Sequence, residues 1–194
     1  YPFTYGHQYL AETAASQCDT LHVFVVSEDA SLVPFSVRWQ LVQEGLAHLP
    51  NVVLHESGPY IISSATFPSY FLKDEAAVIE GHARLDLAVF RKIAAALNVT
   101  ARYVGEEPTS QVTVLYNQIM PEQPPQGGIA CVAPPRGTGG RAPISASTVR
   151  TCLKNGDWAA LKELVPPTTY RYFTSPEAES VLARIRQADQ VVHY

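Results

Sequence analysis

The chain has 194 residues, of which 46% are hydrophobic and 16% are charged, a composition typical of a globular protein and unlike that of a disordered one. Fourteen Lys and Arg residues against eighteen Asp and Glu residues give a net charge of -4, which argues against nucleic acid as a partner because such proteins need a basic face. No apolar run approaches the roughly 20 residues that a membrane helix requires, so we expect no membrane partner.

The three cysteines, Cys18, Cys131 and Cys152, are widely spaced and form no CxxC pair or Cys/His cluster. Sparse cysteines in odd number are typical of the reducing cytoplasm, where we expect this protein to reside. His82 and Asp86 have a helical spacing that suits a metal, but such a pair is more often a local hydrogen bond. We therefore expect no metal-binding residues.

The first predicted element is a loop, Pro2 to His7, that leads into a helix over residues 7–17. A helix start directs backbone N–H groups and the positive end of the helix dipole at one point, which suits phosphate. His7 would donate to a phosphate oxygen, Thr4 adds a hydroxyl, and Gly6 allows close approach of a ligand. The alternative is an ordinary capping turn. Because a phosphate-binding loop of this kind should follow a β-strand, we expect the first strand to lie upstream of residue 1.

Strands and helices alternate along the rest of the chain. Strands are predicted over residues 20–26, 51–56, 99–104 and 129–133. Helices are predicted over residues 35–49, 74–98, 109–120, 149–153, 157–164 and 176–187, with 74–98 as either one long helix or a broken pair. This order builds right-handed βαβ units. The sequence therefore predicts an α/β fold, with a Rossmann-like, open, mainly parallel sheet and helices on both faces.

A second polar segment, Ile144 to Arg150, places three hydroxyls and an arginine at the start of the predicted helix over 149–153. The hydroxyls belong to Ser145, Ser147 and Thr148. A plain helix N-cap is the alternative interpretation, since Ser and Thr favour that position. Earlier in the chain, Gly105 and Glu107 follow a predicted strand end, where ligands of open α/β sheets bind; a solvated turn is the alternative.

The pair Thr-x-Gly-His at residues 4–7 and Ile-Ser-Ala-Ser-Thr-Val-Arg at 144–150 resembles the nucleotidylyltransferase superfamily. The second segment departs from the strict motif at Ala146 and Ser147. Together with Phe-Val-Val-Ser-Glu-Asp at 24–29 and Phe-Pro-Ser-Tyr-Phe-Leu-Lys at 67–73, these motifs resemble the C-terminal, nucleotidylyltransferase-like domain of the citrate lyase ligase family. The resemblance covers roughly the first 155 residues. Full-length members of that family resemble fusions with an upstream acetyltransferase-like region.

This resemblance implies an ATP-dependent ligase that activates acetate as acetyl-adenylate, releases pyrophosphate, and acetylates the prosthetic-group thiol of the citrate lyase acyl carrier protein. Mg²⁺ is expected with ATP. His7, Thr4 and Arg150 are implied as catalytic residues. The implied ATP-binding residues are Phe3, Thr4, Gly6, His7, Arg38, Gly105, Glu107, Ile144, Ser145, Ser147 and Thr148. Tyr70 and Lys73 are implied as contacts of the second substrate.

Three interpretations stay open at this point. Arg38 is equally well explained as a solvated surface charge, and the segment over 61–73 as a packed surface loop. The enzyme could instead be an adenylyltransferase for a phosphopantetheine-like or nicotinamide-like phosphate, or the domain could bind a nucleotide without catalysis. Lys73 is the only basic residue of its segment, which favours a small carboxylate. We expect the ATP-binding domain over 1–155 and C-terminal helices over 156–194 packed on it or trailing from it.

Overall fold

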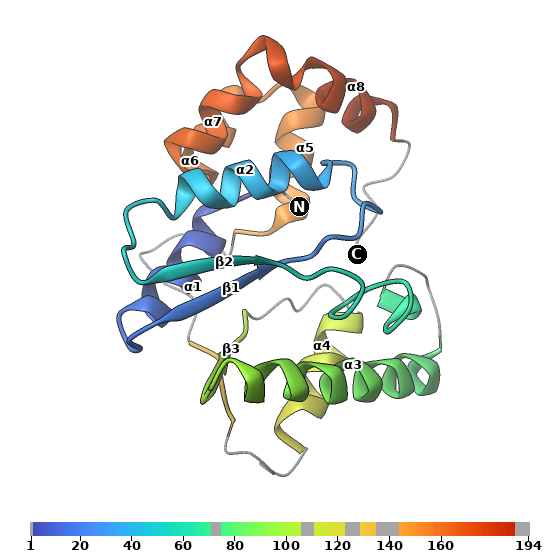
Figure 1. Cartoon of the computed structure of the whole chain (residues 1–194). Coiled ribbons are helices and arrows are strands. Elements are labelled where there is room, and N and C mark those ends of the chain that lie inside the picture. The colour runs from blue at the N-terminus through green and yellow to red at the C-terminus, as the bar shows by residue number, and fades with distance from the viewer. Residues whose placement is uncertain (1, 71–74, 106–110, 123–128, 135–143, 189–194) are drawn as a thin grey trace. The chain divides into compact units, whose positions relative to one another are not determined.

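The computed structural model describes residues 2–70, 75–105, 111–122, 129–134 and 144–188 (Figure 1). The chain divides into two compact units. The first combines Tyr1–Val25, Asp29–His55 and Pro135–His193, and the second consists mainly of Val26–Glu28 and Glu56–Pro134. Within the described ranges, no helix has both the length and the apolar character needed to cross a membrane.

The first unit contains one pair of strands and most of the helices. Strand β1 (Leu21–Val25) pairs with β2 (Val52–Glu56). The helices are α1 (Tyr5–Ala15), α2 (Phe35–Gly45), α5 (Ala146–Asn155), α6 (Trp158–Leu164), α7 (Pro167–Phe173) and α8 (Glu179–Gln187), with a 3-10 turn η2 at Pro176–Ala178. Helices α1 and α2 pack on β1, α7 packs on α2, and α5 packs on α6 and α8.

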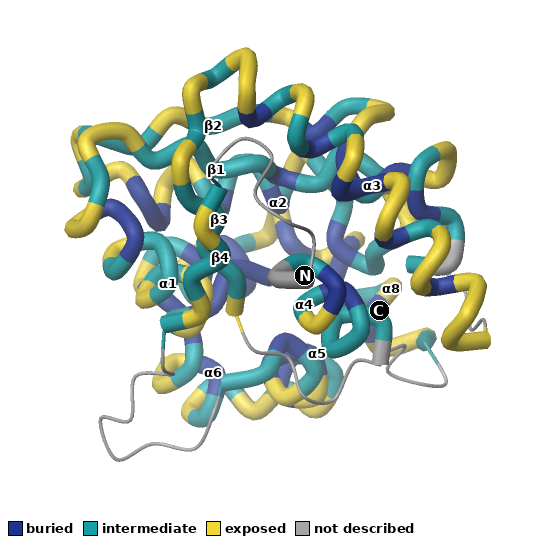
Figure 2. Tube along the Cα trace, turned by 90° about the horizontal axis from the view of Figure 1, so that it is seen from below, coloured by how far each residue is buried: buried dark blue, intermediate teal, exposed yellow. Residues whose placement is uncertain are grey.

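The core of the first unit joins the two ends of the chain. Phe3, which precedes α1, is buried together with Leu41 from α2 and with Val149 and Leu153 from α5. Figure 2 colours the buried parts of the trace dark blue. The predicted first loop and the predicted late motif are therefore anchored in one hydrophobic core.

The second unit contains a βαβ segment and a long helix. Strand β3 (Ala101–Tyr103) pairs with β4 (Ala130–Val132) in parallel, with Arg102 opposite Cys131. Helix α4 (Gln111–Glu122) lies between these strands in sequence and packs against α3 (Ala76–Ala96), and a 3-10 turn, η1 (Pro68–Tyr70), also contacts α3. The buried core of this unit consists of Phe67, Ile79, Ala83, Leu87, Tyr116 and Ile119.

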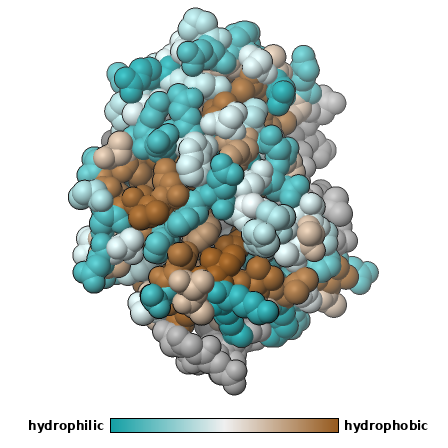
Figure 3. Space-filling model, viewed as in Figure 1, coloured by the Kyte–Doolittle hydropathy of each residue, from teal (hydrophilic) through white to brown (hydrophobic). Residues whose placement is uncertain are grey.

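The alternating strands and helices confirm the predicted α/β fold of nucleotidylyltransferase type. Among the described residues, the four strands form two sheets of two strands each. The large apolar side chains that stay exposed in the same ranges are Tyr9, Val53, Tyr60, Val78 and Leu85. In Figure 3, apolar side chains form separate patches among hydrophilic ones.

Several helix predictions needed correction: α1 begins at Tyr5 and α5 at Ala146, two and three residues before the predicted starts. Helix α2 ends at Gly45 instead of continuing to residue 49, although Leu46 remains buried in the core. The apolar spacing thus extends past the helix, because Leu46 and Leu49 keep packing on the core after the backbone leaves the helical conformation. Helix α7 was not predicted, because Pro166 and Pro167 suggest a break. In the structure Pro167 occupies the first helical turn, where its missing N–H costs nothing.

Candidate functional site

The loop before α1 folds as a reciprocal capping box. Thr4 is the N-cap residue, and its hydroxyl accepts a hydrogen bond from the backbone N–H of His7 at 3.4 Å. In return, the backbone N–H of Thr4 donates to Nδ1 of His7 at 3.0 Å. A Glu or Gln side chain usually makes this second bond, so His7 takes the place of the usual residue. Thr4 is buried, and its hydroxyl lies 3.0 Å from the same Nδ1 atom.

These contacts determine which nitrogen of His7 carries the proton. Nδ1 accepts the backbone N–H of Thr4, so the hydrogen of the neutral ring resides on Nε2. His7 keeps solvent-exposed surface, yet the protein surrounds the imidazole closely enough that desolvation lowers its pKa from 6.5 to about 4. The ring also stacks on Phe3, with centroids 5.8 Å apart. At neutral pH, His7 is therefore a neutral and oriented N–H donor.

The start of α5 gathers three hydroxyl groups. Ser145 is the N-cap residue, and its Oγ accepts a hydrogen bond from the backbone N–H of Thr148 at 3.1 Å. The same Oγ lies 2.8 Å from Oγ of Ser147 and 2.8 Å from Oγ1 of Thr148. Arg150 follows in the next turn and is buried. Hydroxyls, backbone N–H groups and the positive end of a helix dipole together suit an anion with several oxygens.

The two polar segments lie next to each other although they are far apart in sequence. A Cβ atom added at Gly6 would lie 3.5 Å from the carbonyl oxygen of Ile144 and 4.0 Å from its Cβ. The same atom would lie 3.4 Å from the hydroxyl oxygen of Thr4. Gly6 therefore allows the start of α1 to approach the residue that precedes α5. The structure thus brings Phe3, Thr4, Gly6 and His7 next to Ile144, which directly precedes the hydroxyl cluster of Ser145, Ser147 and Thr148.

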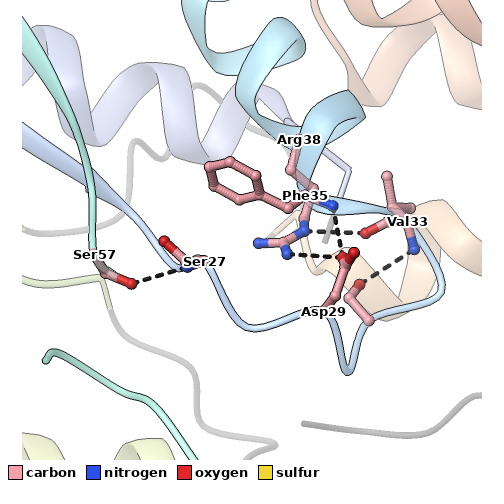
Figure 4. Close-up of polar contacts among 7 residues, drawn as sticks. Ser27, Asp29, Val33, Phe35, Arg38 and Ser57 are labelled. Carbon is pink, nitrogen blue, oxygen red and sulfur yellow. Dashed lines mark hydrogen bonds and ion pairs between the residues drawn. The ribbon is translucent and has the colours of Figure 1, made fainter. Parts of the chain in front are cut away.

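Arg38 is buried at the start of α2, so the interpretation as a solvated surface charge is wrong (Figure 4). Its Nε donates to the carbonyl oxygen of Val33 at 3.0 Å, and its Nη2 lies 3.6 Å from a carboxylate oxygen of Asp29. That oxygen also accepts the backbone N–H of Phe35 at 2.7 Å. Burial lowers the pKa of Arg38, and the Asp29 carboxylate opposes that shift. Arg38 therefore holds the loop between β1 and α2 in place.

The remaining predicted site residues belong to the second unit or lie outside the described residues. Gly105 is exposed, and its carbonyl oxygen accepts a hydrogen bond from the Asn117 side chain at 3.1 Å. Tyr70 is half-buried, and its ring centroid lies 5.5 Å from that of Phe67. Glu107 and Lys73 lie outside the described residues.

Two structurally important carboxylates were not predicted as such. Asp29 accepts from both α2 and Arg38, and the only signal was a carboxylate that follows a strand. Asp86 was considered as a partner of His82, but its carboxylate contacts the backbone N–H of Ile62 and the hydroxyl of Tyr116 instead. The sequence signal was an Asp within the apolar stripe of the predicted helix. The structure shows that this Asp is fully buried.

Comparison with known proteins shows the same similarity along most of the chain. A family model, the citrate lyase ligase C-terminal domain, matches residues 1–173. The chain is 45% identical over 177 residues to a citrate (pro-3S)-lyase ligase of Haemophilus influenzae, an alignment that covers 88% of this chain and 53% of the relative. It is 43% identical over 178 residues to the ligase of Klebsiella pneumoniae, covering 88% of this chain and 52% of that protein.

The ligase of the same name from Escherichia coli is 43% identical over 180 residues, covering 88% of this chain and 50% of the relative. The chain therefore spans about half the length of the curated relatives that it matches. With a family match through residues 1–173 and relatives at these identities, the chain belongs to the citrate lyase ligase C-terminal domain family, as its motifs predicted.

Proposed function

We propose that this chain carries out the ATP-dependent step of a citrate lyase ligase, with acetate as the acid that is activated. A carboxylate oxygen of acetate attacks the α-phosphorus of ATP, the bond from that phosphorus to the bridging oxygen breaks, and pyrophosphate leaves. The prosthetic-group thiolate of the citrate lyase acyl carrier protein then attacks the acetyl carbon, and AMP leaves. Support comes from the family match and from relatives named citrate (pro-3S)-lyase ligase.

The observation that carries the proposal is the oriented, neutral His7 at the start of α1, whose neighbour Gly6 approaches Ile144, the residue before the N-cap of α5. We propose that its Nε2–H donates to oxygens of the α- and β-phosphates as charge develops there, which is the usual way for a protein to assist phosphoryl chemistry. The Thr4 hydroxyl lies against the other ring nitrogen, so Thr4 supports His7 in this scheme. A direct contact between Thr4 and the α-phosphate stays a prediction.

The start of α5 suits the leaving pyrophosphate. We propose that the hydroxyls and backbone N–H groups of Ser145, Ser147 and Thr148 bind the β- and γ-phosphates, and that Arg150 neutralises the pyrophosphate as it leaves. In the part of the chain that the structure describes, no three His, Cys, Asp or Glu side chains are grouped so as to hold a metal ion. We propose that Mg²⁺ is held largely by the phosphates of ATP and by water, as it commonly is in such sites.

The roles of the other predicted contacts follow from their surroundings. Phe3 supports the His7 ring from the core, and Ile144 leads the chain to the start of α5. Arg38 would shape the loop that follows β1, and Gly105 with Glu107 would contact the nucleoside. Tyr70 and Lys73 would contact acetate.

All three cysteines are free thiols, as expected in the reducing cytoplasm that we propose as the compartment.

Exchange of radiolabelled pyrophosphate into ATP tests this function directly. With the purified chain and Mg²⁺, exchange should require acetate, and a His7→Gln variant should lose about 100-fold or more of the rate. His48→Gln is the matched control, because His48 lies on the surface and contacts Glu12 at 2.7 Å. Exchange that depends on a phosphate ester instead of acetate would support an adenylyltransferase, and ATP binding without exchange would support a non-catalytic module.

A further inference from the structure

The segment from Ser57 to Phe67, in the second unit, is held by side chains from outside it. The backbone N–H of Ser27 donates to Oγ of Ser57 at 2.9 Å, and the backbone N–H of Gly58 donates to Oγ of Ser27 at 2.8 Å. Figure 4 shows the first of these bonds. Farther along, the backbone N–H of Ser64 donates to the Glu28 carboxylate at 2.8 Å. The segment therefore has a defined conformation despite lacking strands and helices before η1.

The middle of this segment contains a strained residue. Ile62 has a φ of 47°, a left-handed conformation that a β-branched side chain strongly disfavours. Its backbone N–H donates to Oδ1 of Asp86 at 2.6 Å, and the Thr66 hydroxyl donates to the same oxygen at 3.4 Å. Asp86 is fully buried on α3. A short hydrogen bond from the Ile62 N–H to a buried carboxylate thus keeps Ile62 in this conformation.

The second oxygen of Asp86 connects the segment to Tyr70. The hydroxyl of Tyr116 donates to Oδ2 at 2.7 Å, and burial raises the pKa of Tyr116, so the phenol remains a donor. The ring of Tyr116 stacks on Phe67 with centroids 5.7 Å apart, and Phe67 contacts the ring of Tyr70. One carboxylate therefore contacts the backbone at Ile62 and is linked, through the rings of Tyr116 and Phe67, to Tyr70.

We propose that Asp86 is a positioning residue for the acid that is activated: it holds the segment 57–67 and Tyr70 in the conformation that receives a small carboxylate. This inference rests on the proposed function. Strained backbone that is held by surrounding contacts is characteristic of binding and catalytic segments. Burying a carboxylate costs desolvation free energy, and an apolar residue at position 86 could stabilise the fold to a similar degree. We therefore attribute the buried Asp to the conformation that it gives to the segment 57–67.

The test uses Asp86→Asn, which keeps the size of the side chain but removes its charge and leaves one carbonyl oxygen for the donors that Asp86 now accepts, so the bonds from Ile62 and Tyr116 cannot both be kept at full strength. We expect the KM for acetate in the exchange assay to rise about tenfold or more, as for the loss of a hydrogen bond to a charged group, while the KM for ATP stays within about twofold. Amide hydrogen exchange within 57–67 should accelerate by a similar factor. Glu80→Gln, an exposed position on the same helix, is the control and should change neither quantity.

A second substitution separates strain from a general loss of structure. Ile62→Gly removes the side chain that disfavours positive φ, so in the Asp86→Asn background it should restore part of the amide protection and of the KM for acetate. Asn98→Gly is the matched control, because Asn98 has a φ of 55° at the end of α3 and should rescue neither.

The outcomes distinguish this inference from the proposed function. Unchanged protection of 57–67 in Asp86→Asn, or equal increases in KM for acetate and ATP, would overturn the positioning role. Absence of acetate-dependent exchange in the unaltered chain would overturn the proposed function and the role toward acetate, while amide exchange would still show whether Asp86 holds the segment.

Discussion

Gly45 leaves space for the Phe3 ring, which stacks on His7. A Gly45→Ala substitution should therefore disturb the positions of Phe3 and His7. A Cβ atom at this position would lie 2.2 Å from Cε1 and 2.6 Å from Cδ1 of Phe3. Carbon atoms in contact are about 3.5 Å apart at the closest, so the ring would have to retreat by about 1.3 Å. Phe3 is only 5% exposed among Leu41, Val149 and Leu153, so little space is available for that movement.

The expected size of the effect combines two opposing contributions. Overpacking a core costs about 1 to 3 kcal/mol of the free energy of unfolding. Replacing Gly by Ala in a helix raises the free energy of unfolding by about 1 kcal/mol, because Ala has the higher helix propensity. The net loss is therefore about 0 to 2 kcal/mol, and the melting temperature of a chain of this size should fall by up to roughly 8 °C. Because the Phe3 ring stacks on His7, the KM for ATP should rise as well.

Gly81→Ala provides the matched control for this measurement. Gly81 also lies in a helix, α3, but a Cβ atom there would have no heavy atom within 4 Å. This variant should melt at the same or a higher temperature, since only the gain in helix propensity remains. Melting curves followed by circular dichroism measure both variants. A Gly45→Ala chain as stable as Gly81→Ala would refute the packing argument.

Three further predictions concern the two helix starts and the cysteines. Because burial lowers the pKa of His7 to about 4, its contribution to stability is fully present above pH 6.5 and is lost as the pH falls toward 4. His7→Gln should remove that slope from denaturation measured across this range; an identical slope would show that other groups cause it. Ser145→Ala should cost about 1 kcal/mol of stability through the lost cap and should raise the KM for ATP in the exchange assay. A KM equal to that of the unaltered chain would limit Ser145 to capping. Replacing Cys18, Cys131 and Cys152 by Ala should leave the exchange rate intact, because the proposed acyl carrier is another protein. Loss of exchange in a folded triple variant would contradict this, and the burial of Cys152 makes a modest loss of stability the expected side effect.

Sequence alone determined the features that depend on neighbouring residues. The caps at Thr4 and Ser145 each involve hydrogen bonds within three residues, so the local pattern was sufficient to place a helix start at both motifs. The α/β fold followed from the order of strands and helices, and the family from the motifs themselves. The proposed roles of Glu107 and Lys73 stay predictions, since those residues lie outside the described part of the chain.

Only the tertiary structure decided how distant residues meet. Gly6 approaches Ile144, and Gly45 leaves space for Phe3, although no sequence periodicity relates these residues. The burial of Arg38 likewise depends on the packing around it. The contact of Asp86 with Ile62 and Tyr116 is of the same kind. Local sequence patterns indicate which groups can form hydrogen bonds or pack. The packing of the whole core determines which partner each buried group meets, because buried polar groups must be hydrogen-bonded.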